Sequence, residues 1–265
     1  MGRTVHVAIV SHGNAMEVAA LLGDLERIAS PVDLSVLLVL NHAEELPFSA
    51  DDFSFPMQIH GNGHPQGFAA NNNLAFRLCK PGDDDLFCII NPDVRLPAEI
   101  FEPLLGCLAP DVALVAPLAT DSRGKTGDNA RALPRPATIV RKALGRSDGL
   151  DPTDGHARPV DWVAGLFMLF SARAFAAVGG FDERYFLYYE DVDICCRLRL
   201  SGWRVLWSPT VRVQHDARRS SHRRLPFLLR HIRSMTRFFL SSTYRRSLHL
   251  PAGGSVGHEG SAPGA

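Results

Sequence analysis

"DLFCIINPDV", residues 85–94, is the stretch from which the fold can be inferred most directly. Its apolar run from Leu86 to Ile90 shows no polar alternation, which is typical of a strand buried on both faces of a sheet. The run stops at Asn-Pro-Asp, an ordinary turn sequence. The stretch therefore predicts a central strand that is followed at once by a carboxylate, Asp93, at one edge of the sheet.

Strands and helices alternate on both sides of this strand. Buried strands are expected at 5–11, 33–41 and 112–118, a short strand at 57–62, and helices at 15–28, 67–79 and 98–108. Such alternation predicts an α/β fold with a mixed, mostly parallel sheet flanked by helices. In these sheets ligands bind beyond the carboxyl ends of the strands, which correspond here to residues 11–14, 40–43 and 91–93.

The second half of the chain is less regular. Residues 120–159 are rich in Gly, Pro and Arg, which favours a long flexible loop that acts as a lid or binding loop. Ordered elements are then expected at 160–180 (a strand or buried segment, then a helix), 191–201 (helix), 203–209 (strand) and 211–215 (strand). One domain is predicted over 1–222, a basic amphipathic helical extension over 223–248, and a disordered tail over 249–265.

Composition limits the class of protein. The apolar fraction is 46% and the charged fraction is 21%, as in ordinary globular proteins. The formal net charge is zero, so no global basic field for nucleic acid exists, although ten arginines and a single acid, Asp216, lie between Arg212 and Arg246. Five cysteines without metal-ligand spacing, and no secretion signal or membrane span, predict a cytoplasmic protein with reduced thiols.

"YYEDVD", residues 188–193, places three acids directly before an expected helix. Acids at a helix start are stabilised by capping and by the helix dipole, but one acid would satisfy that need. Asp193 can pair with Arg197 four residues on. Glu190 and Asp191 remain, and capping, metal binding and proton acceptance are all open to them.

Two further positions could carry chemistry. Asp93 is either a turn residue or a ligand for a divalent cation, since Mg²⁺ and Mn²⁺ often use one or two protein carboxylates plus substrate phosphate. His215 ends an expected strand and is either solvated or a third partner for such a cation. The asparagines at 71–73 are either capping groups or pocket-lining groups. A P-loop and the GxGxxG motif are both absent, which disfavours a dinucleotide fold.

Several of these pieces resemble the family 2 glycosyltransferases of GT-A fold, most of all the bacterial rhamnosyltransferase-like branch. They are "VAIVSHGN" (7–14), "GFAANNN" (67–73), "INPDV" (90–94), the long block 162–205 and "VRVQH" (211–215). The resemblance implies a Rossmann-like nucleotide-diphospho-sugar transferase. It implies inverting, metal-dependent transfer from a dTDP- or UDP-sugar, with rhamnose one candidate. A glycan or lipid-linked acceptor in cell-surface polysaccharide synthesis is implied, with Mg²⁺ or Mn²⁺ as cofactor.

The resemblance also implies roles for particular residues. Asp191 corresponds to the general base, Glu190 to a group that orients the acceptor or the base, Asp93 with His215 to the metal site, and Trp162 with Gly165 to the acceptor side. Donor contacts are expected from Ser11, Asn14, Asn41, Gly67, Asn71, Asn91 and Asp93.

One position departs from the family pattern: Leu40 stands where an Asp commonly contacts the donor base or ribose. An alternative is therefore a catalytically silent domain that binds nucleotide-sugars or acts as a scaffold. A metal-dependent phosphohydrolase is a third hypothesis, but it would need more acids and histidines near Asp93. The helix at 226–244 either packs on the domain or binds the inner face of the plasma membrane. The sequence gives no indication of oligomeric state.

Overall fold

The computed structural model describes residues 3–28, 33–127, 129–136, 155–216 and 225–253. The strands are β1 (Thr4–Ser11), β2 (Asp33–Leu40), β3 (Met57–Gly61), β4 (Leu86–Ile90), β5 (Val94–Arg95), β6 (Val112–Thr120), β7 (Ala130–Arg131), β8 (Arg158–Pro159), β9 (Trp162–Val163), β10 (Phe167–Ser171) and β11 (Arg204–His215). The helices are α1 (Ala15–Glu26), a 3-10 turn (Ala50–Asp52), α2 (Phe68–Cys79), α3 (Phe101–Leu105), α5 (Ala172–Ala177), α6 (Glu190–Leu200), α7 (Leu225–Leu240) and α8 (Ser242–Ser247).

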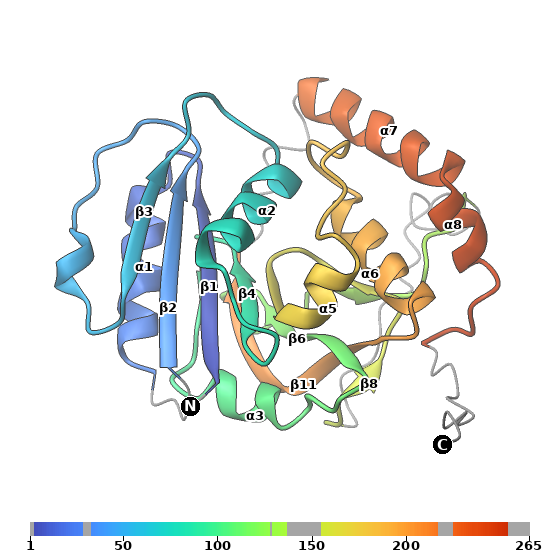
Figure 1. The fold of residues 1–265 in the computed structure, drawn as a ribbon, viewed down its shortest axis with the longest axis horizontal. Coiled ribbons are helices and arrows are strands. Elements are labelled where there is room, and N and C mark those ends of the chain that lie inside the picture. Colours follow the sequence, from blue (N-terminus) through green and yellow to red (C-terminus); the bar gives the residue numbers. More distant parts are fainter. Residues whose placement is uncertain (1–2, 29–32, 128, 137–154, 217–224, 254–265) are drawn as a thin grey trace, which may run out of the picture.

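The main sheet confirms the predicted mixed, mostly parallel architecture (Figure 1). Its order is β3-β2-β1-β4-β10-β6-β11-β5. β10 runs antiparallel to both of its neighbours, β4 and β6, whereas β6 and β11 are parallel. The carboxyl ends of β1, β2, β4 and β11 therefore lie at the same edge as the start of β10.

Each face of the sheet has its own core because successive strand residues point to opposite sides. Val7 and Ile9 of β1 join a cluster covered by α1 and α3, while Ala8 faces a second cluster covered by α2, α5 and α6. Full burial of a large apolar side chain contributes about 1.5–3 kcal/mol. With both faces covered, the edge at the carboxyl ends is where polar groups collect.

Two predicted boundaries were wrong. The strands expected at 203–209 and 211–215 form one strand, β11, whose register against β6 shifts between Ser208 and Arg212. Pro209 explains the irregularity because proline has no amide to give to the ladder. The helix expected at 98–108 is confined to α3, which ends at Gly106.

The segment predicted as a long loop carries short pairings where it is described. Thr120 bridges Thr126, and β7 pairs with β9 in a separate two-stranded sheet. Residues 137–154, which form much of that predicted loop, lie outside the described residues.

The C-terminal extension also differs in its limits. The helix expected at 226–244 is two helices, because Ser241 is extended and its hydroxyl accepts the amide of Tyr244 at the start of α8. The predicted tail is tied down at its beginning: Arg199 donates to the carbonyl of Pro251 (2.6 Å), and the amide of Gly253 donates to Asp161 (2.8 Å). Residues 254–265 lie outside the described residues.

Candidate active site

Asp93 and His215 meet at the carboxyl edge of the sheet. His215 ends β11 and is the register partner of Val94, the residue after Asp93. The pairing brings His215 Nε2 to 3.4 Å from Asp93 Oδ2, with both side chains partly exposed. Two groups that are far apart in sequence are thus neighbours across one ladder, as the metal-site prediction requires.

This pair fits a divalent cation. Asp93 offers an oxygen and His215 an imidazole nitrogen, a donor set suited to Mg²⁺ or Mn²⁺ when other positions go to water and phosphate. No cluster of three or more His, Cys, Asp or Glu side chains placed to hold a metal is found among the described residues. A cation held by this pair would therefore have two protein ligands and would need further ligands from solvent or substrate.

A short run of backbone contacts joins the end of β4 to the head of α6. The amide of Asn91 donates to the carbonyl of Leu166 (2.9 Å). The amide of the preceding residue, Gly165, donates to Asp191 Oδ2 (3.2 Å). The turn that carries Asp93 and the carboxylate of Asp191 are therefore bound to the same piece of backbone, and Gly165 takes part through its amide.

Asp191 is held as a partly exposed carboxylate at the first turn of α6. Its Oδ1 accepts the amide of Val192 (2.9 Å) and its Oδ2 that of Gly165. Burial raises the pKa of Asp191 above its ordinary value, while these amides and the cation of Arg131 act in the opposite direction. A raised pKa makes a carboxylate a stronger proton acceptor, which suits a general base.

Glu190 is more deeply enclosed than Asp191. Its side chain is 5% exposed, and its Oε2 has no hydrogen-bond partner. Burial, and then the neighbouring charge of Asp191, raise the pKa of Glu190 well above its ordinary value. Burial thus favours the protonated form of both adjacent acids and raises the pKa of Glu190 well above its ordinary value, whereas two backbone amides and the cation of Arg131 favour the ionised form of Asp191.

The helix start itself is unusual. α6 begins at Glu190, one residue earlier than predicted, and Tyr189 is its N-cap without a side-chain hydrogen bond. Tyr188 and Tyr189 both have positive φ (71° and 69°), which is strained for residues with a side chain. Strain of this kind persists only where the surroundings impose it, and it collects at functional sites.

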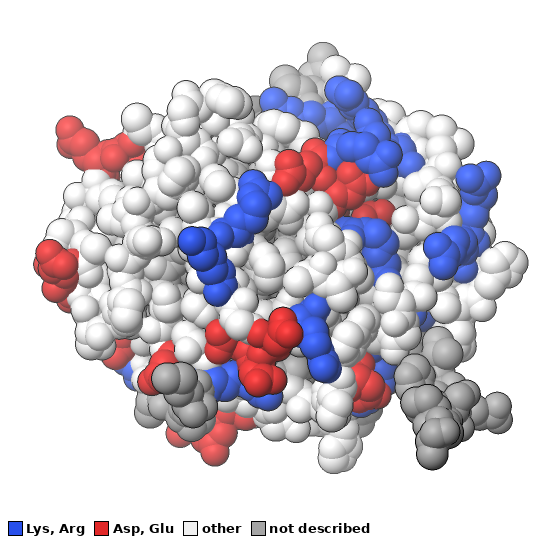
Figure 2. Space-filling view, viewed as in Figure 1, with Lys and Arg blue, Asp and Glu red and all other residues white. Residues whose placement is uncertain are grey.

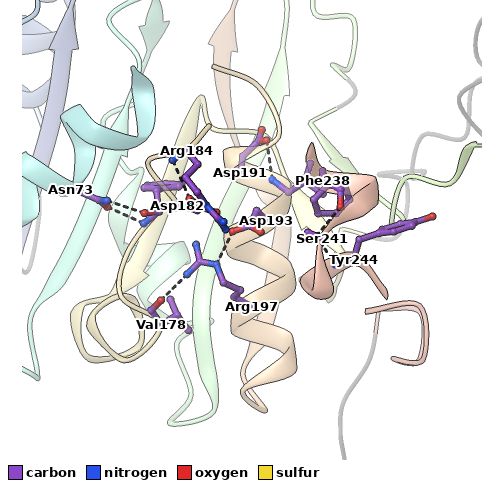
Figure 3. A network of polar contacts seen from close by, with 12 residues as sticks. Asn73, Val178, Asp182, Arg184, Asp191, Asp193, Arg197, Phe238, Ser241 and Tyr244 are labelled. Carbon is purple, nitrogen blue, oxygen red and sulfur yellow. Dashed lines mark hydrogen bonds and ion pairs between the residues drawn. The ribbon is translucent and has the colours of Figure 1, made fainter. Parts of the chain in front are cut away.

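Asp193 has the structural role predicted for it. Arg197 Nε donates to Asp193 Oδ2 (2.7 Å), and Arg197 Nη1 donates to the carbonyl of Val178 (2.6 Å). Figure 3 shows this pair along α6, with Asp191 at the head of the helix. Asp191 and Asp193 thus serve different partners although they are one residue apart.

On the donor side, Asn41 is fully engaged. Its amide nitrogen donates to the carbonyl of Gln66 (2.9 Å) and to His12 (2.6 Å), and its oxygen accepts Asn62 Nδ2 (2.8 Å) and the amide of Gln66 (2.7 Å). Asn62 also donates to Asn71 Oδ1 (2.7 Å). These amides bind the ends of β2 and β3 to the start of α2, so Asn41 and Asn71 hold three elements together at this edge of the sheet.

The other predicted donor residues lie at the same edge. Ser11 is buried, and its hydroxyl accepts the amide of Asn14 (3.1 Å). Gly67 is in close contact with the segment before Glu190: a Cβ there would stand 2.4 Å from the carbonyl oxygen of Phe186. The amide of Phe68 donates to that same oxygen (2.9 Å). Gly67 therefore permits α2 to approach the acidic segment.

On the acceptor side, Trp162 is covered by a residue that sequence reasoning missed. Trp162 is 8% exposed, and its Nε1 donates to the carbonyl of Ala132 (2.9 Å). The guanidinium of Arg131 lies over the ring, 5.0 Å from its centroid. Arg131 belongs to the two-residue strand β7, and no motif or periodicity singled it out. The exposed group at this position is therefore Arg131 rather than the indole.

Several known proteins are similar to this chain in sequence or in fold. Residues 59–237 match a protein-family model described as "Glycosyltransferase like family 2". The chain is 32% identical over 182 residues to N-acetylglucosaminyl-diphospho-decaprenol L-rhamnosyltransferase of Mycobacterium tuberculosis, covering 62% of this chain and 57% of that protein. It is 28% identical to rhamnosyltransferase WbbL of Escherichia coli K12, covering 80% of this chain and 83% of that one.

Solved structures show the same fold. A mannosyltransferase of Pyrobaculum calidifontis in complex with GDP-Man and Mn²⁺ aligns with a TM-score of 0.62 at 17% identity, over 92% of this chain and 68% of that one. GalNAc-T7 with UDP, GalNAc and Mn²⁺ aligns with a TM-score of 0.64 at 15% identity, over 81% and 43%. These matches confirm the predicted GT-A fold. Since the family model covers more than half of the chain, the protein belongs to the family 2 glycosyltransferases.

Proposed function

We propose that the protein is an active inverting glycosyltransferase that moves a sugar from a nucleotide-diphosphate donor to a hydroxyl of a glycan or lipid-linked acceptor. The observation that carries the proposal is Asp191, a carboxylate oriented by two backbone amides beside a buried acid. An alcohol is a weak nucleophile near neutral pH, so a positioned base must take its proton as attack develops. We assign that base to Asp191, and direct attack by the acceptor hydroxyl on the donor inverts the anomeric carbon.

The chain's own residues divide the work between base and leaving group. Asp191 takes the acceptor proton at its carboxylate, and Glu190 keeps its proton, so that repulsion between the two acids is avoided. Asp93 and His215 would hold Mg²⁺ or Mn²⁺, which supplies charge neutralisation at the departing diphosphate when bound. The locked amides around Asn41 keep the donor pocket in shape before substrate arrives.

Rhamnose and a diphospho-lipid acceptor are the substrates we favour. The proposal rests on the two rhamnosyltransferases among the relatives, one of which is named for a diphospho-decaprenol substrate. The chain spans only 57% of that protein's length, so these substrates need a direct assay. A dTDP- or UDP-sugar is the expected donor.

A lipid-linked acceptor would be reached through α7. No described helix is both long and apolar enough to cross a membrane. The predicted stripe on α7 splits: Met235 and Phe239 pack on the domain, whereas Leu228 and Ile232 are 48% and 44% exposed. Leu229 beside them is 59% exposed.

Cations accompany these exposed apolar side chains. Arg230 and Arg233 are exposed, and Figure 2 shows basic side chains gathered over α7 and α8. Apolar groups between cations are typical of an interfacial helix at an anionic bilayer. We therefore expect peripheral binding through α7 at the inner face of the plasma membrane.

Vesicle sedimentation tests the membrane contact. Leu229→Glu is expected to reduce binding to vesicles that contain phosphatidylglycerol, while Leu78→Glu, at a partly exposed leucine on α2, should leave it unchanged. Equal binding by the two variants would contradict the contact.

Donor turnover tests the activity. Wild type is expected to release nucleoside diphosphate from a dTDP- or UDP-sugar in the presence of Mn²⁺ and a sugar linked to prenyl diphosphate as the hydroxyl acceptor, and Asp191→Asn to lose this activity. A thermal-shift screen of nucleoside diphosphates with Mn²⁺ runs in parallel, because a ligand that binds only the folded state raises Tm. Binding without turnover by wild type would favour the silent-domain alternative, which the replacement at Leu40 motivates.

A further inference from the structure

Arg131 occupies a place that the proposed reaction does not yet explain. Its cation acts on two groups at the mouth of α6: it lowers the pKa of Asp191 against burial, and it lowers that of Tyr189, which burial raises to about 12. The guanidinium lies 5.0 Å from the centroid of Trp162. Arg131 stands opposite Trp162 in the ladder, and three residues after Trp162 the amide of Gly165 donates to Asp191 Oδ2 (3.2 Å), so the cation is placed on the segment that holds the expected base.

The backbone around Arg131 is fixed on both sides. Asn129 accepts the amide of Ala164 at its carbonyl (2.8 Å), and its side chain binds the backbone of Pro117 (2.8 Å) and Ala119 (3.2 Å). Two residues after Arg131, the amide of Leu133 donates to the buried carboxylate of Asp161 (2.6 Å). The ladder between β7 and β9 sets Arg131 opposite Trp162.

This double anchoring is more than a surface arginine needs. A long, flexible cation loses rotamer freedom when it is held in place, so an arginine laid on an aromatic face between two backbone anchors is preorganised. The charged or titratable groups that face Asp191 within the described residues are Glu190 and Cys195 on α6, Tyr189 before it, and Arg131 on β7. Arg131 is the cation of that set.

We propose that Arg131 is a positioning residue that keeps Asp191 ionised beside the buried Glu190, so that one acid of the pair is always the base and the other always holds the proton. The inference rests on the proposed role of Asp191 as the base. Trp162 serves it indirectly, as the surface on which the guanidinium lies. Trp162, which was assigned to the acceptor side, would then support the site by holding Arg131, whose charge acts on Asp191.

The chain offers a matched control. Arg158 of β8 lies over Trp207, also with 5.0 Å between guanidinium and ring centroid, and it too comes from a two-residue strand. Arg131 is among the groups that shift the pKa of Asp191 most, and Arg158 is not. Replacement of Arg158 therefore removes an arginine that lies on a tryptophan, and it is expected to leave the environment of Asp191 unchanged.

Carbon-13 NMR of aspartate labelled at Cγ measures the ionisation without any substrate, with Asp191→Asn to identify the resonance. In Arg131→Gln the titration midpoint of Asp191 is expected to rise by about one pH unit. Arg131→Lys should restore most of the wild-type midpoint, and Arg158→Gln should leave it unchanged. Arg131→Met, whose chain can stay on Trp162, serves as the neutral variant should glutamine disturb folding.

Kinetics give the second readout. In the neutral Arg131 variants, the pH at which kcat/KM for sugar transfer falls on the acid side is expected to rise together with the NMR midpoint. At pH values below this limb kcat/KM should be about tenfold lower than in wild type, and above it little changed. An unchanged midpoint in both neutral variants would overturn the proposal. So would a raised acceptor KM with no movement of the limb, which would make Arg131 an acceptor-binding group. If the neutral Arg131 variants shift the Asp191 midpoint but the wild-type protein turns over no donor, the proposed function is refuted. The electrostatic effect of Arg131 on Asp191 would still be upheld.

Discussion

Buried carboxylates occur in two kinds of surroundings in this molecule. Asp24 on α1 is 4% exposed and accepts both Arg95 Nε (2.6 Å) and the amide of Leu96 (3.1 Å). Asp161 is 5% exposed and receives Arg199 (2.9 Å) and the amide of Leu133. Glu190 is equally buried, but one of its oxygens has no partner.

The difference separates structure from chemistry. A buried charge is costly unless it is paired and hydrogen-bonded, and Asp24 and Asp161 meet that requirement. Glu190 Oε2 has no hydrogen-bond partner among the described residues, and burial raises the pKa of Glu190 well above its ordinary value, which places a perturbed acid beside Asp191. Strongly perturbed acids at an open edge are where catalysis is expected.

The largest effect is expected at the base. Asp191→Asn should lower sugar transfer by about 10²–10⁴-fold, because the single side-chain oxygen of asparagine can still accept one of the two backbone amides but cannot accept the proton. Initial rates of nucleoside diphosphate release measure it, with circular dichroism to check the fold. Asp193→Asn, in the same turn but paired with Arg197, should lose far less activity. Equal losses in the two variants would remove the distinction between them.

Replacement of a buried acid that is paired with an arginine should lower the stability of the fold. Asp161→Ala leaves the buried Arg199 without its carboxylate and is expected to cost about 3–5 kcal/mol of unfolding free energy. Urea denaturation measures this cost. Asp111→Ala removes an exposed partner of Arg204 and should cost under about 1 kcal/mol. A small effect at Asp161 would mean that its pairing adds little to the fold.

The position of the acidic segment depends on a glycine. Gly67→Ala would place a methyl group against the carbonyl of Phe186 and should destabilise the protein by about 1–3 kcal/mol. Because the shifted segment leads into Glu190, activity should fall more than Tm suggests. Gly63→Ala, where a Cβ meets nothing within 4 Å, is the control. Full activity in Gly67→Ala would show that the acids do not depend on this contact.

The smallest effect is expected from Glu190. With its pKa raised on folding, the folded protein holds a proton that the unfolded chain releases above about pH 4.3. Wild-type stability is thus favoured at low pH and falls as pH rises toward the raised value. Glu190→Gln should flatten this slope, gain on the order of 1 kcal/mol at pH 8, and keep activity within about tenfold. Thermal unfolding from pH 5 to 9 tests this, and unchanged slopes would argue against a protonated Glu190.

Local spacing predicted part of this site. The i, i+4 relation of Asp193 and Arg197 gave the correct ion pair because a helix brings such residues together whatever surrounds it. The apolar run at residues 86–90 likewise predicted a buried strand with Asp93 at its end. The proximity of Asp93 and His215 was a hypothesis from metal-ligand chemistry and from the family resemblance, not from spacing, and the pairing of β5 with β11 brings the two residues together.

What escaped prediction depends on tertiary contacts. Arg131 lies in a two-residue strand, too short for any periodicity, and only its pairing with Trp162 brings it to Asp191. The sequence predicts Asn41 as a donor contact, yet its side-chain amide makes four hydrogen bonds to segments that are distant in the sequence. Pro209 suggested a break between strands, whereas the sheet absorbs it as an irregularity.

The position of β11 has a consequence for how the protein is made. The first four strands of the order, β3-β2-β1-β4, are complete once residue 90 has been synthesised, and they can assemble early. β11 must insert between β6 and β5 after almost the whole domain has left the ribosome, and it closes the longest loop of the sheet. His215 is the last residue of that strand. The Asp93–His215 pair therefore forms only when β11 docks, and a nascent chain that has not yet folded β11 lacks this pair.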